Sequence, residues 1–222
     1  MVVGLEGPHE IIPPWLRSHI SREDLLVVTK AIHTAEAPTD GEIVPVIVHR
    51  SVSSSHIGTV CVLALWLVAI ASALAVGLHN EWVQLASLLG FLTVFGWWLG
   101  TLDSVIRLLT PSAEIERAVW QRAKAEFLDQ KIGHTKRATG VLLFLSMTEH
   151  RAIVLADQAI SAKFNQDSWQ EVCNRLVAGL KGGDLKEGLV SAINLSGSMM
   201  TKHFPAVDGG SNQLPDRLVI RE

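Results

Sequence analysis

The 222-residue chain has only two cysteines, and neither is placed to form a disulfide. Cys61 lies inside a long apolar run, whereas Cys173 lies in a segment with helical periodicity, so the sequence gives no sign of an oxidising compartment. The formal net charge of −3 comes with no run of basic residues. This balance gives no reason to expect binding to nucleic acid.

Several catalytic and targeting signatures are also missing. The sequence has no Gly-x-Ser-x-Gly segment, which argues against the nucleophile elbow of a serine hydrolase. His134, His150 and His203 lack the spacing of zinc ligands, and no dense acidic loop of the EF-hand kind occurs. The first eight residues contain neither a basic segment nor a long apolar one, so we expect no cleaved signal peptide.

Two long apolar runs dominate the first half of the chain. Thr59–Leu78 and Trp82–Leu102 contain no charged residue and are separated only by His79-Asn80-Glu81. Each run is long enough to cross a hydrocarbon core of about 30 Å as a helix. Because the connector is so short, the two helices would be antiparallel. We therefore predict a transmembrane helical hairpin over residues 57–103, with the lipid bilayer as its partner.

The distribution of Lys and Arg predicts how this hairpin is oriented. The connector has neither residue, whereas four arginines flank the outer ends of the runs, namely Arg50, Arg107, Arg117 and Arg122. By the positive-inside rule, both termini and the soluble part are expected on the cytoplasmic side of an inner (plasma) membrane. Trp82, Trp97 and Trp98 lie near the ends of the second run, where an interfacial belt would place them.

The residues on either side of the hairpin have the patterns of one α/β domain in two parts, of about 175 residues in total. Residues 1–20 are taken as an N-terminal extension and 21–52 as the first part. Ser21 is expected to cap a helix from Arg22 to about Ala37. A β-branched strand, Glu42–Val48, follows, and Pro45 within it indicates that the strand is at or near a sheet edge, or bulged there.

The second part of the domain is expected over residues 111–204. It begins with a helix from Ser112 to about Asp129 and a polar loop. Two strands follow, Val141–Ser146 and Ala152–Ala156, which must be antiparallel because a short turn joins them. Two helices close this part, one capped by Ser168 and one capped by Asp184. Residues 205–222 are expected to form a C-terminal surface strap.

A series of motifs, in this order along the chain, resembles the TPM domain. The quoted segments are Ala35-Glu36, Thr39–Val44, Phe127, Gly133-His134-Thr135, Thr139–Phe144, Leu155-Ala156-Asp157, Trp169, Gly183-Asp184-Leu185, Gly188-Leu189, His203-Phe204-Pro205 and Leu214–Arg217. The resemblance is to the bacterial membrane-protein branch, in which a transmembrane pair interrupts the domain after its first strand. Gln158-Ala159 departs from the Arg/Lys-Gly that commonly follows the aspartate.

The resemblance implies a three-layer α/β/α fold with a small mixed sheet, interrupted here by the two-helix hairpin. It leaves the function open. Relatives include a plant thylakoid lumen protein described as an acid phosphatase, a photosystem II repair factor and an animal receptor-associated protein. Some members bind a divalent metal.

The expected strand order brings several polar residues to one end of the sheet. If the first two strands are parallel and the third is antiparallel, Glu42, Thr139 and Asp157 lie at the same end, with Asp40 and Arg137 in nearby loops. Carboxylate and hydroxyl oxygens suit Ca²⁺ or Mg²⁺, and Arg137 would contact a phosphate held through that metal. The alternative is structural, with these side chains capping turns and a strand end.

We therefore expect a membrane-anchored accessory or scaffold protein that docks on a membrane protein partner and has no catalytic activity. This hypothesis depends on the predicted transmembrane hairpin and on the lack of a recognisable set of catalytic residues in the sequence. The alternative is a divalent-metal-dependent phosphatase, similar to the acid phosphatase, that uses Glu42 and Asp157. No cofactor beyond such an ion is expected.

Overall fold

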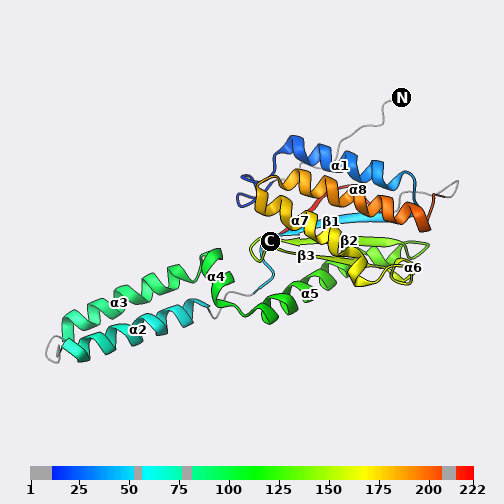
Figure 1. Cartoon of the computed structure of the whole chain (residues 1–222). Coiled ribbons are helices and arrows are strands. Elements are labelled where there is room, and N and C mark those ends of the chain that lie inside the picture. Colours follow the sequence, from blue (N-terminus) through cyan, green and yellow to red (C-terminus); the bar gives the residue numbers. More distant parts are fainter. Residues whose placement is uncertain (1–11, 53–56, 77–81, 207–213) are drawn as a thin grey trace. The chain divides into compact units, whose positions relative to one another are not determined.

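The computed structural model describes residues 12–52, 57–76, 82–206 and 214–222 (Figure 1). The chain divides into two compact units, one formed by residues 1–50 and 119–222 and the other by residues 51–118. We call them the α/β unit and the helical unit. The predicted connector, His79-Asn80-Glu81, lies outside the described residues.

A four-stranded mixed sheet forms the centre of the α/β unit. Its strands are β1 (Glu42–Val48), β2 (Gly140–Ser146), β3 (Arg151–Ala156) and β4 (Val219–Arg221), in the order β3-β2-β1-β4. β1 is parallel to both β2 and β4, and β2 is antiparallel to β3. These pairings agree with those expected for the first three strands. All residues of β1 and β2 are buried, as is typical of central parallel strands.

Pro45 lies in β1, which neighbours the edge strand β4, as expected of a strand at or near a sheet edge. The N–H of Glu42 donates to the carbonyl of Thr139 at the start of β2 (3.1 Å). By alternation along the strand, the nitrogen of Pro45 points to the opposite side. On that side β4 pairs only with Val46–Val48. Pro45 therefore removes no hydrogen bond from the sheet.

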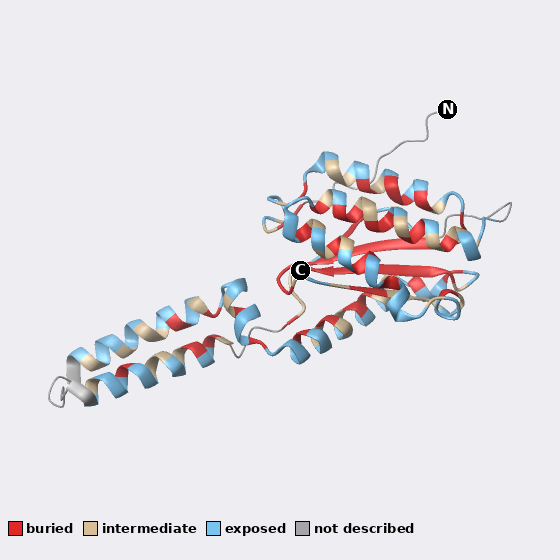
Figure 2. Ribbon diagram, in the orientation of Figure 1, coloured by how far each residue is buried: buried red, intermediate tan, exposed pale blue. Residues whose placement is uncertain are grey.

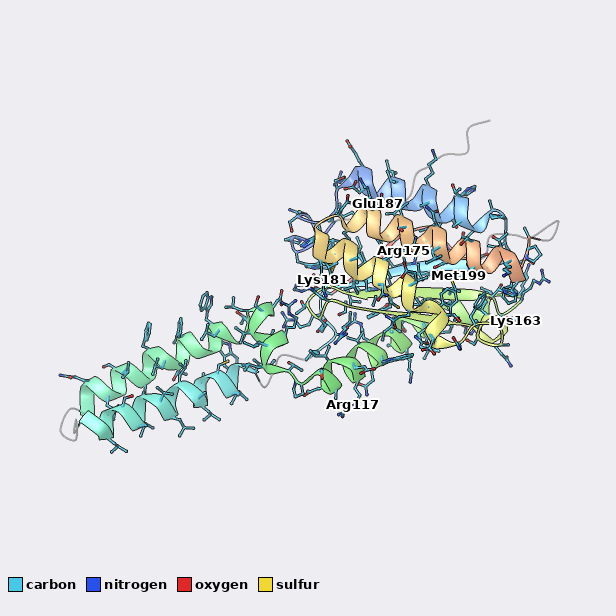
Figure 3. The ribbon with its side chains drawn as sticks, in the orientation of Figure 1. Arg117, Lys163, Arg175, Lys181, Glu187 and Met199 are labelled. Atoms are coloured by element: carbon cyan, nitrogen blue, oxygen red, sulfur yellow. The ribbon has the colours of Figure 1, made fainter. Side chains whose placement is uncertain are left out.

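Helices cover both faces of the sheet (Figure 1). α1 (Arg22–Glu36), α7 (Gln170–Gly182) and α8 (Leu185–His203) pack on one face. The core on this side is apolar and includes Val28, Ile32, Ile47, Leu143, Leu176, Leu189 and Ile193. Figure 2 shows the buried residues on the inner sides of these helices and along the strands. The outer sides of α7 and α8 carry charged residues, among them Arg175, Lys181 and Glu187 (Figure 3).

The part of α5 (Ser112–Asp129) that belongs to the α/β unit lies on the other face of the sheet (Figure 1). Polar contacts tie it to the C-terminal strand. Arg122 Nη2 donates to the carbonyl of Glu222 (2.8 Å), and Glu126 Oε2 lies 3.7 Å from Arg221 Nε. Glu126 is 3% exposed, and the two arginines compensate its buried charge.

The ends of the helices follow local signals with one exception. Ser21 caps α1 and Asp184 caps α8, as predicted. Ser168 does not cap α7, because its own N–H donates to Asn165 Oδ1 (3.0 Å) at the start of the short 3-10 helix η2 (Gln166–Trp169). Asn satisfies an N-terminal N–H as well as Ser does. The apolar periodicity does not distinguish this extra turn from the start of α7.

Both ends of the chain contribute to the core, which the sequence analysis did not anticipate. Leu16 and Ile20, assigned above to an N-terminal extension, are buried. The C-terminal residues do not form only a surface strap, because Leu218 and Val219 are buried and β4 extends the sheet beside β1. A strand of three residues is too short to show a period-2 pattern.

The helical unit contains α2 (Ile57–Val76), α3 (Trp82–Leu99) and the short α4 (Asp103–Leu109). α2 and α3 run side by side in opposite directions (Figure 1). Ile57–Leu74 is long and apolar enough to cross a membrane. Gln84–Leu99 passes that test only together with Asp103–Leu109, and the two are bent by 89°. By length and composition the described residues hold one candidate span, or two if the bent pair counts as one.

Candidate functional site

The predicted site residues lie at the end of the sheet where β1 and β2 begin and β3 ends. Glu42 is opposite Gly140 in the parallel pair, and the N–H of Asp157 donates to the carbonyl of Gly140 (2.9 Å). Glu42 and Asp157 therefore flank β2, with their Cα atoms about 10 Å apart at two strand spacings. The metal hypothesis requires these residues to share one end of the sheet, as they do, and also requires their side chains to converge.

Loop residues meet around Asp40. The carboxylate of Asp40 forms an ion pair with Arg137, and the Asp40 carbonyl accepts a hydrogen bond from Thr139 Oγ1 (2.7 Å). The N–H of Thr139 donates to Thr135 Oγ1 (3.0 Å). The Asp40 side chain is 8% exposed and that of Arg137 is 57% exposed. The guanidinium of Arg137 is therefore accessible to a ligand, whereas the carboxylate of Asp40 lies beneath it.

Asp157 is the N-cap of the short helix α6 (Gln158–Ser161). Its Oδ1 atom accepts the N–H of Gln158 (2.7 Å). Its Oδ2 atom is buried and has no hydrogen-bond partner among the described residues. A buried carboxylate oxygen without a donor is unfavourable. A cation or a ligand N–H or O–H at this position would satisfy it.

The loop that leads into β2 is tightly folded. The 3-10 helix η1 (Ile132–His134) passes over the start of β2, so a Cβ atom at Gly140 would lie 2.4 Å from the carbonyl oxygen of Ile132. Ala138 has a φ of 53°, in the left-handed region that residues other than glycine seldom occupy. The Ala138 carbonyl accepts the N–H of Ala159 in α6 (3.1 Å). Packing against α6 thus holds this strained residue in place.

A second group of acids, which the sequence analysis missed, includes Glu42. Glu36, the last residue of α1, lies beside Glu42 and Asp216, and its Oε1 atom accepts the N–H of Ile43 (2.6 Å). Burial raises the pKa of Glu36 to about 9, the bond from Ile43 opposes this shift, and the charges of Asp216 and Glu42 add to it. Glu36 is therefore protonated at neutral pH and hydrogen-bonded to Asp216. No local spacing connects residues so far apart in the chain.

The predicted ligands do not form one cluster. Glu42 lies beside Glu36, Asp157 lies on the other side of β2, and Asp40 is paired with Arg137. Within the described ranges, no three Asp, Glu, His or Cys side chains are grouped as they would be around a metal ion. Metal binding and a phosphate contact at this end of the sheet therefore stay predictions.

Comparisons with known proteins relate part of the chain to a known family. A family model for the TPM domain matches residues 105–198. This match confirms the expected membership of the TPM domain family for that part of the chain, which begins after α3. No curated protein sequence matches the chain.

Among solved structures, the chain is similar to the BA42 protein of the psychrophilic bacterium Bizionia argentinensis sp. nov., which was determined by NMR. The TM-score is 0.57 and the sequences are 19% identical, with 90% of this chain and 94% of the BA42 chain covered. At this identity the likeness shows the fold alone.

Proposed function

We propose that this protein is a TPM-domain protein anchored in a membrane by α2 and α3, and that it acts as an accessory protein without catalysis of its own. The family match concerns the domain and does not address the anchor. The proposal of an anchor is supported by one observation above all, the apolar outer surface of α2 and α3.

Apolar side chains cover the outer surface of the α2–α3 pair as well as the contact between the two helices. The exposed large apolar residues are Val60, Leu63, Leu67, Val68, Ile70, Leu74, Leu88, Phe91, Val94, Phe95, Trp97 and Trp98, and exposed positions predominate on both helices in Figure 2. The share of Ile57–Leu74 that is buried is 22%, whereas a core helix of a soluble protein would be mostly buried. Acyl chains match such a surface, which in water would favour aggregation.

The contact between the two helices is made by small residues. A Cβ atom at Gly100, just beyond the end of α3, would lie 2.3 Å from the Cα of Gly58, and one at Gly96 would lie 3.0 Å from the Cα of Val62. Gly96 and Gly100 have the Gly-x-x-x-Gly spacing. In membranes this spacing lets helices approach closely, because packing rather than the hydrophobic effect holds them together.

Polar side chains of α2 and α3 form hydrogen bonds within this helix pair. Trp66 Nε1 donates to the carbonyl of Leu89 (3.2 Å) and to Thr93 Oγ1 (3.2 Å). The hydroxyl of Thr93 donates to the carbonyl of Leu89 (2.7 Å), and that of Ser72 donates to the carbonyl of Val68 (2.8 Å). A helix pair in a hydrocarbon region needs such internal partners, since no water is present there.

Membrane extraction tests the anchor. We expect the full chain to stay with the membrane pellet after alkaline carbonate washing and to be released by detergent. Leu67→Arg combined with Val94→Arg should move it to the soluble fraction or prevent its accumulation, because both side chains are 72% exposed in the middle of their helices. Leu26→Arg, at a position 66% exposed on α1, is the matched control. Recovery of the unaltered chain as a stable soluble oligomer would overturn the proposal.

We also propose that both termini and the α/β unit are cytoplasmic, because the arginines flank the outer ends of the helices. Reporter fusions after Glu222 and within His79–Glu81 test this orientation. A reporter at Glu222 that is active only outside the cytoplasm would contradict it.

An anchored domain can meet only those proteins that come close to the membrane, which supports a membrane protein as the docking partner. Cross-linking the full chain in its membrane and identifying the proteins attached to it tests this role. We expect one membrane protein in roughly equal amount. Recovery of the chain alone at every cross-linker length would contradict an accessory role.

A second candidate function, a divalent-metal-dependent phosphatase, is favoured by the buried Oδ2 atom of Asp157 without a donor and by the accessible guanidinium of Arg137. Ca²⁺ or Mg²⁺ would bind at the end of the sheet, and Arg137 would contact the phosphate. A screen against phosphate esters with and without these ions separates the two functions. Turnover that Asp157→Ala abolishes, while the exposed control Asp167→Ala keeps it, would establish the phosphatase. A flat calorimetric titration with Ca²⁺ would leave these residues a structural role.

A further inference from the structure

The short helix α4 changes direction sharply after α3. It follows the break at Gly100-Thr101-Leu102, and its axis is bent by 89° from that of Gln84–Leu99. Its seven residues span about 10 Å at 1.5 Å per residue. This length is about a third of the hydrocarbon core, so α4 cannot itself cross a membrane.

One side of α4 is apolar and uncovered. Leu102, Val105 and Leu109 recur at three- and four-residue spacing, and Leu108 lies beside them. Leu108 is 83% exposed and Leu109 is 47% exposed, and no other large hydrophobic residue in the described part of the chain is as exposed as Leu108. The opposite side carries the charged residues Asp103 and Arg107, and Ser104 lies at the border next to Leu108. This two-sided pattern is typical of helices that lie in a membrane interface.

Two tryptophans mark the end of α3 from which α4 departs. Trp97 and Trp98, in the last turn of α3, are 62% and 55% exposed. Exposed tryptophan side chains are enriched at the level of the lipid headgroups. The break at Gly100 follows directly, so the chain turns by 89° at the depth where a membrane helix would leave the hydrocarbon.

We infer that α4 lies in the plane of the bilayer, at the boundary between headgroups and acyl chains, with Leu108 and Leu109 inserted among the outer acyl segments. The inference rests on the proposed anchor, because a helix at 89° to α3 follows the surface only if α3 stands close to the membrane normal. α4 occupies the leaflet at which α3 ends and from which the chain continues into α5. α4 therefore lies in the membrane interface and connects the anchor to the TPM domain along the chain.

Thiol labelling of the full chain in lipid nanodiscs tests this placement, because both membrane faces are open to solvent there. Cys61 and Cys173 are first replaced by alanine. Single cysteines are then introduced as Leu109→Cys, as Arg107→Cys on the polar side of the same helix, and as Leu67→Cys in the middle of α2. A charged, membrane-impermeant maleimide should label Arg107→Cys roughly tenfold or more faster than Leu109→Cys, because the boundary layer excludes it.

The outcomes separate the inference from the proposal on which it rests. If Leu67→Cys is protected but Leu109→Cys reacts as fast as Arg107→Cys, the interfacial placement of α4 is wrong and the anchor stands. Rapid labelling of Leu67→Cys would instead overturn the anchor. Protection of Arg107→Cys to the same degree as Leu109→Cys would indicate a re-entrant segment, which also overturns an interfacial position.

Discussion

Replacement of Glu36 by glutamine is expected to stabilise the protein at neutral and alkaline pH. The carboxyl group of Glu36 is buried beside Glu42 and Asp216, and burial raises its pKa from 4.5 to about 9. The protonated carboxyl group accepts the N–H of Ile43 and shares a hydrogen bond with Asp216. Glutamine keeps one acceptor and one donor group in nearly the same shape but has no proton to lose.

The sign and size of the effect follow from the two pKa values. The folded protein holds this proton up to about pH 9, whereas the unfolded chain releases it near pH 4.5. Between these values the folded state binds more protons, so the free energy of unfolding falls as pH rises and levels off outside this window. At about pH 7.5, three units above the unfolded pKa, keeping the proton costs up to about 4 kcal/mol. Removing this cost would raise the unfolding temperature by roughly 10 °C as an upper limit.

Thermal unfolding of the detergent-solubilised chain, followed by tryptophan fluorescence between pH 4.5 and 9, measures the difference. Trp169, 2% exposed in the core, reports unfolding of the α/β unit. We expect Glu36→Gln to match the unaltered protein near pH 4.5 and to unfold at increasingly higher relative temperature as pH rises. Glu23→Gln, on the exposed first turn of α1, is the control and should show no such divergence. A difference that is the same at pH 5 and pH 8 would refute the reasoning.

Three further substitutions test the packing described above. Gly140→Ala should lower the free energy of unfolding in urea by about 1–3 kcal/mol, because its Cβ would lie 2.4 Å from a carbonyl oxygen of η1. Gly182→Ala is the control and should not lower it, because no atom lies within 4 Å of the Cβ position there. Ala138→Gly should raise it by about 1 kcal/mol by relieving the left-handed backbone, and a loss would show that this residue is unstrained. Gly100→Leu should weaken the α2–α3 contact by about 1–3 kcal/mol in mixed micelles, with Gly90→Leu, whose Cβ would meet nothing within 4 Å, as the unaffected control.

The pairing of the first three strands could be predicted from the sequence. Two apolar segments separated only by the short turn Thr148-Glu149-His150-Arg151 can only be antiparallel neighbours, as β2 and β3 are. A long connection from β1 to β2 favours parallel pairing, and the observed register places Glu42 opposite Gly140. Both inferences use chain connectivity, which is explicit in the sequence.

The elements that the sequence analysis missed depend on contacts between distant residues or on very short segments. β4 has three residues, and its place beside β1 is fixed by pairing with Val46–Val48 rather than by a pattern of its own. The pairing of Glu36 with Asp216 joins the end of α1 to the C-terminal segment. Neither carboxyl group differs, in its local sequence, from one exposed to solvent, so the raised pKa of Glu36 could not be read from the sequence.

The sequence predicted which of these residues share one end of the sheet, but not how their side chains are grouped there. Connectivity decides which strand ends meet, and this brought Glu42 and Asp157 to either side of β2. It does not decide which neighbour a side chain turns to, because this depends on packing against α1, α6 and the loops. Asp157 therefore caps α6, and Glu42 joins the buried acids around Glu36.

The helical unit is inserted after β1, at a point that keeps the sheet intact and lies at the opposite end of β1 from the candidate site. A parallel pair such as β1 and β2 needs a crossover that returns along the length of the sheet, and α2, α3 and α4 extend this crossover at the end of β1 without interrupting any ladder. The chain leaves the α/β unit at Arg50, whereas the candidate site lies where β1 begins. Seven residues of β1 separate these two ends by about 20 Å. A ligand at the Glu42 end would therefore bind at the opposite end of β1 from the point where the helical unit is inserted.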